Sequence, residues 1–175
     1  MYILGDIGNT ETKIWLVSKK NHIIKKINFS SKEVTNYKLS KIFKKYNFKF
    51  KDIEKILFCS VVPPTFNLIK KFLSKKTNNK CYEVKSLSLK SLIKIKVDYK
   101  QVGSDRITNA ISLMNNKNNF IILDFGTATT FDVLVQNTYY GGIIAPGVKL
   151  SLNSLSDKAT LIPRINLKKI TKVIG

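Results

Sequence analysis

The segment Phe120-Ile-Ile-Leu-Asp-Phe-Gly-Thr-Ala-Thr-Thr-Phe-Asp132 determines the fold that we predict for this chain. Its apolar start, residues 120–123, is typical of a buried strand, and the β-branched run 129–135 predicts a second strand. Between them lies the turn Asp124-Phe-Gly126, whose glycine lets backbone N–H groups point outward. Such a loop can hold a phosphate, and its aspartate can hold a cation beside that phosphate.

The same pattern occurs at the N-terminus, where Tyr2-Ile-Leu-Gly-Asp-Ile-Gly-Asn-Thr10 is followed by the strand-like run 13–17. One Asp-x-Gly turn would be weak evidence, but two such turns, each between apolar strands, indicate an internal duplication. We therefore predict two similar half-domains whose loops face each other across a cleft and bind one nucleotide. The superposition pairs Asp6 with Asp124, Gly8 with Gly126, Asn9 with Thr127, and Val17 with Val135.

The composition favours a cytoplasmic globular protein. The chain has 175 residues, 43% of them hydrophobic, which suffices for one or two small cores. No apolar run approaches the ~20 residues that a membrane span needs, so we expect no membrane partner. No basic segment precedes the first apolar run, which argues against a signal peptide. Cys59 and Cys81 match no metal-binding spacing and are expected to be reduced core thiols.

The net charge of +20 raises the question of nucleic-acid binding. Of the 31 basic residues, however, only Arg106 and Arg164 are arginines, and the lysines are spread along the chain among Asn and Ile. Base readout and bidentate phosphate contacts favour arginine, so we expect no specific nucleic-acid partner. Nonspecific binding to polyanions at low salt is expected and carries no functional information.

Hydrophobic periodicity predicts an α/β protein with the order βββαβαβ in the first half-domain, residues 1–100. The second half-domain, residues 101–175, is expected to begin with a helix near Gly103, capped by Ser104 or Asp105, and to continue as βββα. If the halves are duplicates, the second lacks a strand, a helix and a further strand. The first half should have strands within 1–18, 22–29, 53–62 and 80–84 and helices at 31–46 and 65–74, with a connection at 86–100. The second should have strands at 120–123, 129–135 and 139–145 and a helix after 147.

Four motifs, in their order, resemble those of the type III pantothenate kinase family, within the acetate and sugar kinase/Hsp70/actin superfamily. They are Asp6-Ile-Gly-Asn-Thr-Glu-Thr-Lys13, Ser60-Val-Val-Pro63, Gly103-Ser-Asp-Arg106, and Asp124 to Asp132 followed by Tyr140-Gly-Gly-Ile-Ile-Ala-Pro-Gly147. The resemblance implies duplicated ribonuclease H-like (actin-like ATPase) half-domains with mixed βββαβαβ sheets, the second one incomplete. It also implies transfer of the ATP γ-phosphate to the primary hydroxyl of pantothenate, the first step towards coenzyme A.

The resemblance further implies a role for each motif residue. Asp105 is the implied base that accepts the hydroxyl proton. Asp6 is implied to hold Mg²⁺ through water, and Asp124 to bind a monovalent cation, K⁺ or NH₄⁺. The implied contacts of ATP are Asp6, Ile7, Gly8, Asn9, Thr10, Glu11, Thr12, Lys13, Gly126 and Thr127. The implied contacts of pantothenate are Tyr99, Gly103, Ser104, Asp105 and Arg106.

Each of these residues also has a structural interpretation. The aspartates of the two turns could cap those turns, and Asp105 could be only a helix cap. Lys13 could be one of many surface lysines, and Arg106 could pair locally. Asp132 is expected to be structural rather than catalytic, and the side chains of Trp15, Tyr139 and Tyr140 are expected in the core or on a strand surface.

The chain departs from the family in three places. One is Ala159-Thr-Leu-Ile-Pro163, which resembles the family's segment after the helix but with altered residues. The segment Val97-Asp-Tyr-Lys-Gln-Val102 lacks the proline that the family has there, and family members run further than Lys172-Val-Ile-Gly175, which resembles the point before a substrate-contacting threonine. We therefore expect a fragment, a truncated gene product or a chain completed by another polypeptide. The resemblance implies a homodimer at full length. Three other functions stay open: a non-catalytic regulatory accessory factor of the same family, an inactive truncated remnant, and a sugar or acetate kinase.

Overall fold

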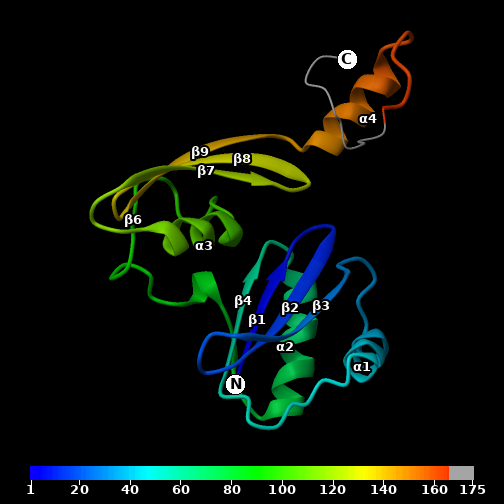
Figure 1. Ribbon diagram of the computed structural model, residues 1–175, viewed down its shortest axis with the longest axis vertical. Helices are drawn as coiled ribbons and strands as arrows, with labels where there is room; N and C mark the ends of the chain where they lie inside the picture. The colour runs from blue at the N-terminus through cyan, green and yellow to red at the C-terminus, as the bar shows by residue number, and fades with distance from the viewer. Residues whose placement is uncertain (166–175) are drawn as a thin grey trace.

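The first half-domain is built on a five-stranded mixed sheet. The computed structural model describes residues 1–165; the segment 172–175 lies outside the described residues. The sheet has the strand order β3-β2-β1-β4-β5, in which β1 pairs antiparallel with β2 and parallel with β4 (Figure 1). Its strands are β1 (Tyr2–Ile7), β2 (Glu11–Val17), β3 (Ile23–Ser30), β4 (Lys55–Ser60) and β5 (Cys81–Glu83).

Two helices, α1 (Asn36–Lys45) and α2 (Pro63–Thr77), complete the first half-domain. The helix α1 begins where the Thr35 hydroxyl accepts a hydrogen bond from the backbone N–H of Lys38, and α2 begins with two prolines, which suit the first turn of a helix. Both helices bury apolar side chains against the sheet, and the order βββαβαβ predicted for this half is confirmed. The core includes Phe43, Ile69, Phe72 and Leu73 from the helices and Ile3, Ile14, Ile56 and Phe58 from the strands.

The second half-domain has a four-stranded sheet with the order β6-β9-β8-β7. The strands β7, β8 and β9 form an antiparallel meander like β1, β2 and β3, as the duplication predicts. The short strand β6 was not expected, because its two residues pair with the edge of β9 and carry no periodic signal of their own. The elements are η1 (Val84–Ser86), β6 (Lys94–Ile95), α3 (Ser104–Leu113), β7 (Asn119–Phe125), β8 (Ala128–Val135), β9 (Thr138–Pro146) and α4 (Val148–Lys158).

The two meanders correspond to each other, but one of the residue pairs expected from the sequence was wrong. Strand pairing is irregular between Leu16 and Val17 in the first half and between Val133 and Leu134 in the second. In the first turn, the backbone N–H of Gly8 donates a hydrogen bond to the carbonyl of Glu11. In the second turn, the backbone N–H of Gly126 donates to the carbonyl of Ala128, so this turn is one residue shorter. Val17 therefore corresponds to Leu134, and the expected match with Val135 was wrong because it ignored this difference in turn length.

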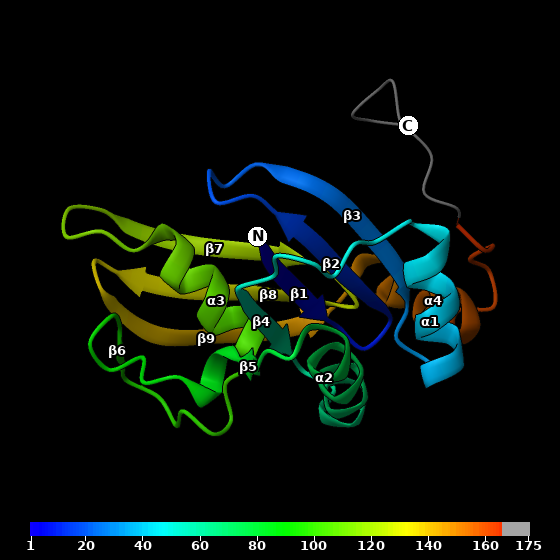
Figure 2. The ribbon, with the colours of Figure 1, turned by 90° about the horizontal axis from the view of Figure 1, so that it is seen from below.

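The helix α3 lies between the two sheets, on the side of the second sheet that faces the first half-domain (Figures 1 and 2). Its residues Ile107 and Ala110 share a second apolar core with Cys59 of β4 and with Leu134 and Tyr139 of the second sheet. Strands from both half-domains therefore pack against one helix. This arrangement carries the start of α3 into the space between the two Asp-x-Gly turns.

The opposite face of the second sheet is exposed and apolar. Ile121, Phe125 and Ile143 are 70%, 68% and 68% exposed. Within residues 1–165, no strand occupies the place beside β7 that β4 occupies beside β1. The helix α4 continues from β9 past the end of the sheet and buries none of its side chains (Figure 1). No helix in the described part of the chain is long and apolar enough to cross a membrane.

Candidate functional site

The two Asp-x-Gly turns lie against each other and line one cleft. Their tips meet where the hydroxyl oxygens of Thr10 and Thr127 lie 2.9 Å apart. The cleft has a volume of about 430 Å³, and residues of both turns line it. It is lined by Asp6, Gly8, Asn9, Thr10, Glu11 and Lys13 from the first half-domain and by Val61, Asp105, Asp124, Phe125, Gly126, Thr127, Ala128 and Thr130.

Two residues of the expected ATP set do not offer their side chains to this cleft. Ile7 is fully buried in the core of the first half-domain. Thr12 is also fully buried, and its hydroxyl lies 2.8 Å from that of Ser31. Because side chains alternate along a strand, the neighbours of these two residues face the cleft instead.

Asp105 reaches the cleft from the first turn of α3. The residue that caps this helix is Gly103, so the expectation that Ser104 or Asp105 would be the cap was wrong. The Asp105 carboxylate folds back over the cap, and its Oδ1 accepts a hydrogen bond of 2.8 Å from the backbone N–H of Arg106. A Cβ atom on residue 103 would lie 2.3 Å from that oxygen, so only glycine leaves room for the carboxylate there.

Three carboxylates of the cleft act on one another. Burial raises the pKa of Asp6 above its usual value, Lys13 opposes this rise, and the negative charges of Asp105 and Asp124 add to it. Lys13 is half exposed, and its Nζ lies 3.7 Å from Glu11, a distance at which the pair is weak. The ammonium group is thus free to contact an anion in the cleft.

Asn109, one helical turn after Asp105, was not among the expected site residues. Its amide donates a 3.0 Å hydrogen bond to Oδ2 of Asp124, which ties α3 to the second Asp-x-Gly turn. Both residues, with Asp6, Asp105 and Trp15, line a second cavity of about 610 Å³ that adjoins the cleft. The spacing of Asn109 four residues after Asp105 was the signal that could have identified it.

The carboxylate oxygens of the cleft suit a cation that is also bound by the phosphates of a ligand. Within residues 1–165, no group of three or more His, Cys, Asp or Glu side chains is arranged to hold a metal by itself. Mg²⁺ commonly binds through one or two carboxylates, waters and substrate phosphates rather than in a cage of protein ligands. The mutual repulsion of Asp6 with Asp105 and Asp124 is the condition that such a cation would relieve.

Arg106 turns away from the cleft and pairs with Asp132. Its Nε donates to both carboxylate oxygens, at 2.8 and 3.1 Å, and its Nη2 lies 2.6 Å from Oδ1. The buried hydroxyl of Tyr139 donates to the same carboxylate. Burial lowers the pKa of Arg106, but the hydrogen bond and charge of Asp132 outweigh that effect and raise it overall. Asp132 is fully buried, which agrees with its expected structural role.

Ser104 is held in a similar way on the other side of Asp105. Its side chain is buried, and its hydroxyl donates to Oε1 of Glu83 at the end of β5. The nearby thiol of Cys59 is buried as well, and burial raises its pKa to about 12. Both cysteines are free, as expected.

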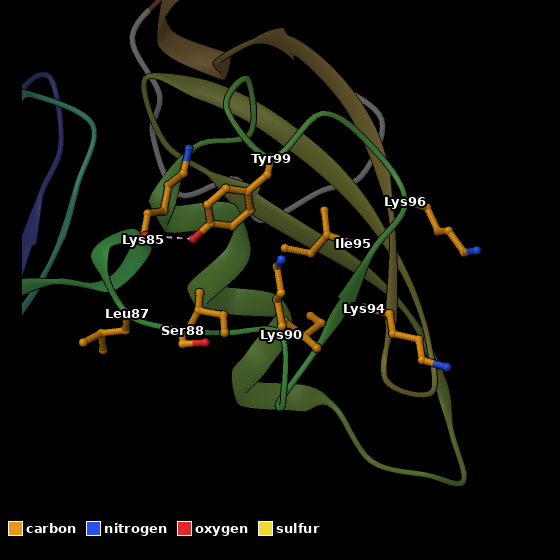
Figure 3. A pocket seen from close by; sticks show the side chains of 10 residues that line it. Lys85, Leu87, Ser88, Lys90, Lys94, Ile95, Lys96 and Tyr99 are labelled. Carbon is orange, nitrogen blue, oxygen red and sulfur yellow. Dashed lines mark hydrogen bonds between the residues drawn. The ribbon is translucent and has the colours of Figure 1, made fainter.

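Tyr99 lies in a different cavity. This cavity has a volume of about 520 Å³ and includes Lys85, Lys90 and Tyr99, with apolar residues around β6 (Figure 3). The Tyr99 hydroxyl donates a 3.0 Å hydrogen bond to the carbonyl of Lys85, whose ammonium lies 4.9 Å from the ring centroid. The structure therefore does not bring Tyr99 together with Asp105 in one cavity.

Comparison with known proteins gives a consistent result. A model of the family described as type III pantothenate kinase matches residues 2–175. The type III pantothenate kinase of Pelagibacter ubique (strain HTCC1062) is 62% identical over 175 residues, which are all of this chain and 71% of that protein. The protein of the same name from Sulfurihydrogenibium sp. (strain YO3AOP1) is 34% identical, and the match covers all of this chain and 72% of that protein.

Solved structures resemble the fold at low identity. One, described as a Baf family transcriptional activator from Campylobacter jejuni, has a TM-score of 0.54 at 19% identity and covers 97% of this chain and 68% of its own. Another, described as a 2-dehydro-3-deoxygalactonokinase from Sinorhizobium meliloti, has a TM-score of 0.50 at 8% identity and covers 92% of this chain and 58% of its own. At these identities, the likeness concerns the fold alone.

Proposed function

The chain belongs to the type III pantothenate kinase family, and we propose that it transfers the γ-phosphate of ATP to the primary hydroxyl of pantothenate, the first step towards coenzyme A. The observation that carries this proposal is that two Asp-x-Gly turns from different half-domains and Asp105 line one cleft. Phosphoryl transfer depends mainly on positioning and on neutralising charge, and this cleft supplies groups for both.

The two turns would hold the phosphates. Gly8 and Gly126 line the cleft, and the hydroxyls of Thr10 and Thr127 meet at the tips of the turns, so backbone N–H groups of these two turns would hold the phosphate oxygens there. Lys13 would place a positive charge beside the phosphates, because its pairing with Glu11 is loose. The contributions of Ile7 and Thr12 would come from the backbone, since their side chains face the core.

Cations would bind at the two aspartates of the turns. Asp6 would hold Mg²⁺ through water, and the cation would supply charge neutralisation for the transferred phosphoryl group. Asp124, oriented by the amide of Asn109, would contribute to a monovalent cation site for K⁺ or NH₄⁺. The charges of Asp105 and Asp124, which help to raise the pKa of Asp6, support this assignment, because a cation would offset the repulsion among these carboxylates.

Asp105 would act as the base. It lies in the cleft between the two turns and would accept the proton of the pantothenate hydroxyl as that oxygen attacks the γ-phosphorus. Gly103, Ser104 and Arg106 surround it and would shape the pantothenate site, with Arg106 kept close by Asp132. We leave Tyr99 out of this site because it lines the separate cavity of Figure 3.

The full-length protein is proposed to be a cytoplasmic homodimer, as the family resemblance implies. The direct test of function is to incubate it with ATP, Mg²⁺ and pantothenate, with and without K⁺, and to identify the product by mass spectrometry. We expect phosphopantothenate, formed faster with K⁺, and a dimer by light scattering. ATP turnover that does not depend on pantothenate, or phosphorylation of a sugar or acetate instead, would contradict the proposal.

A further inference from the structure

Asp105 lies between two residues whose side chains are each held by a carboxylate. The hydroxyl of Ser104, directly before it, donates to Glu83, and the guanidinium of Arg106, directly after it, is paired with Asp132. Glu83 is the last residue of β5 in the first sheet, whereas Asp132 lies in β8 of the second sheet. The first turn of α3 is therefore anchored to both half-domains at once.

The anchor at Asp132 is buried and uses both carboxylate oxygens. Oδ1 accepts hydrogen bonds from Nε of Arg106 and from the hydroxyl of Tyr139, and Oδ2 accepts one from the same Nε at 3.1 Å. Nη2 of Arg106 forms an ion-pair contact with Oδ1 at 2.6 Å. A buried ion pair adds little net stability, because desolvation offsets the attraction between the charges. Its main effect is geometric, because a planar guanidinium on a carboxylate fixes both distance and direction.

Both carboxylate oxygens of Glu83 also accept hydrogen bonds. Oε1 accepts the Ser104 hydroxyl, and Oε2 accepts a 2.8 Å hydrogen bond from the backbone N–H of Lys85 at the start of η1. Ser104 is only 2% exposed, and its carbonyl accepts the hydroxyl of Thr108 at 2.7 Å. This chain of contacts connects the end of β5 to the first full turn of α3.

We propose that Glu83 and Asp132 are positioning residues that act through Asp105, by fixing the first turn of α3 between the two Asp-x-Gly turns. The Asp105 carboxylate accepts a hydrogen bond from the backbone N–H of its neighbour Arg106, so the position of the carboxylate depends on the position of the helix start. This inference rests on the proposed function, in which Asp105 is the base.

A double-mutant cycle in the full-length protein tests the proposal. Glu83→Gln and Asp132→Asn should each lower kcat about tenfold, because a misplacement of about 1 Å can cost on the order of a hundredfold and the loss of one anchor leaves the other in place. The KM for ATP should change less than about twofold, since neither residue lines the cleft. In an Asp105→Asn background, each substitution should change kcat less than about twofold, because two residues that act through one group are not additive.

Equal effects with and without Asp105 would contradict the positioning role of Glu83 and Asp132. If either substitution lowers kcat by the same factor with and without Asp105, its effect is a general loss of structure and the proposal is wrong for that residue. Glu54→Gln serves as the matched control, because Glu54 forms an exposed ion pair of 2.8 Å with Lys19 far from the cleft. If Asp132→Asn or Glu83→Gln does not fold, the milder Tyr139→Phe and Ser104→Ala variants replace them, with the same non-additivity expected.

A second measurement separates this inference from the proposed function. The Nε–H proton of Arg106 should exchange slowly in NMR spectra of the unsubstituted protein and exchange rapidly in Asp132→Asn, with Arg106→Lys used to assign the signal. A rapidly exchanging Arg106 Nε–H in the unsubstituted protein would overturn the anchor. If the protein shows no transfer to pantothenate, the proposed function fails, and the cycle is then measured with the hydroxyl acceptor that it does use.

Discussion

The hydroxyl oxygens of Thr10 and Thr127 lie 2.9 Å apart, at the tips of the two Asp-x-Gly turns. These residues come from duplicated halves of the chain, and their contact brings both Asp-x-Gly turns to one cleft. A hydroxyl at each tip can exchange this mutual hydrogen bond for one to a phosphate oxygen. The pair thus marks the place where the triphosphate of ATP is expected.

Replacing either hydroxyl should weaken ATP binding. A hydrogen bond to a charged group contributes about 1.5–3 kcal/mol, so Thr10→Val or Thr127→Val should raise the KM for ATP roughly tenfold or more. The KM for pantothenate should change little, because we propose that these two hydroxyls contact the phosphates of ATP. Steady-state kinetics measure both values. Thr77→Val is the matched control, because its hydroxyl bonds the Leu73 carbonyl on α2; an equal effect of this variant would refute the assignment.

Gly103→Ala should separate activity from stability. The added methyl group would lie 2.3 Å from Oδ1 of Asp105, and it is the flexible carboxylate that has to move. The backbone at residue 103 has φ −61°, which alanine adopts without strain. We expect kcat to fall about tenfold or more while Tm changes by no more than a few degrees. A fully active variant would show that the carboxylate does not act from its present position.

A divalent cation should stabilise the protein through Asp6. The pKa of this residue is raised by burial and by Asp105 and Asp124, so ionising it costs more free energy than ionising a solvated aspartate. That stabilisation should be present above the pKa of Asp6 and be lost as pH falls through it, because protonation removes the charge that the cation binds. Thermal melts with Mg²⁺ and ATP at several pH values measure this effect.

The Asp6→Asn variant is the control for that experiment. It should be at least as stable as the unsubstituted protein without Mg²⁺, because it removes one of three close negative charges. It should also lose most of the gain in Tm on adding Mg²⁺ and ATP. A variant that keeps the full gain would place the cation elsewhere.

Both cysteines should be unreactive in the folded protein. Burial raises the pKa of each thiol to about 12, so the thiolate is roughly one part in ten thousand at pH 8. Alkylation by iodoacetamide, followed by peptide mapping, should leave Cys59 and Cys81 unmodified until denaturant is added. Any reaction in the native state should become faster as pH rises towards 12. Rapid labelling of Cys59 at neutral pH would show that the second apolar core opens.

The sequence predicted the first half-domain well because its signals are local. The alternation of apolar residues, the two prolines at the start of α2 and the paired Asp-x-Gly turns are all recognised within short stretches of sequence. The duplication also gave the meander β7-β8-β9. The superposition of the two halves was wrong by one residue at Val17, whose counterpart is Leu134. The two turns differ in length, and an alignment of the letters without a gap cannot show that difference.

Other features depend on contacts between distant residues. The strand β6 exists only because its two residues pair with β9. The burial of Arg106 on Asp132, the contact of Ser104 with Glu83 and the amide of Asn109 on Asp124 each join separate elements. Tyr99 was expected at the cleft, but its hydroxyl is held by the carbonyl of Lys85 in another cavity. The periodicity of apolar residues along the sequence does not predict such contacts, because they depend on how the elements pack in three dimensions.

The most direct test compares the full-length protein with its Asp105→Asn variant in a pantothenate-dependent ADP release assay. Our account predicts that kcat falls about 10²–10⁴-fold, the range for loss of a general base, while the KM for ATP stays within about twofold. The variant should also melt at nearly the same temperature, since Asn can keep the hydrogen bond from the Arg106 N–H. Unchanged turnover in the variant would remove Asp105 as the base and contradict the account of this cleft as a phosphotransfer site.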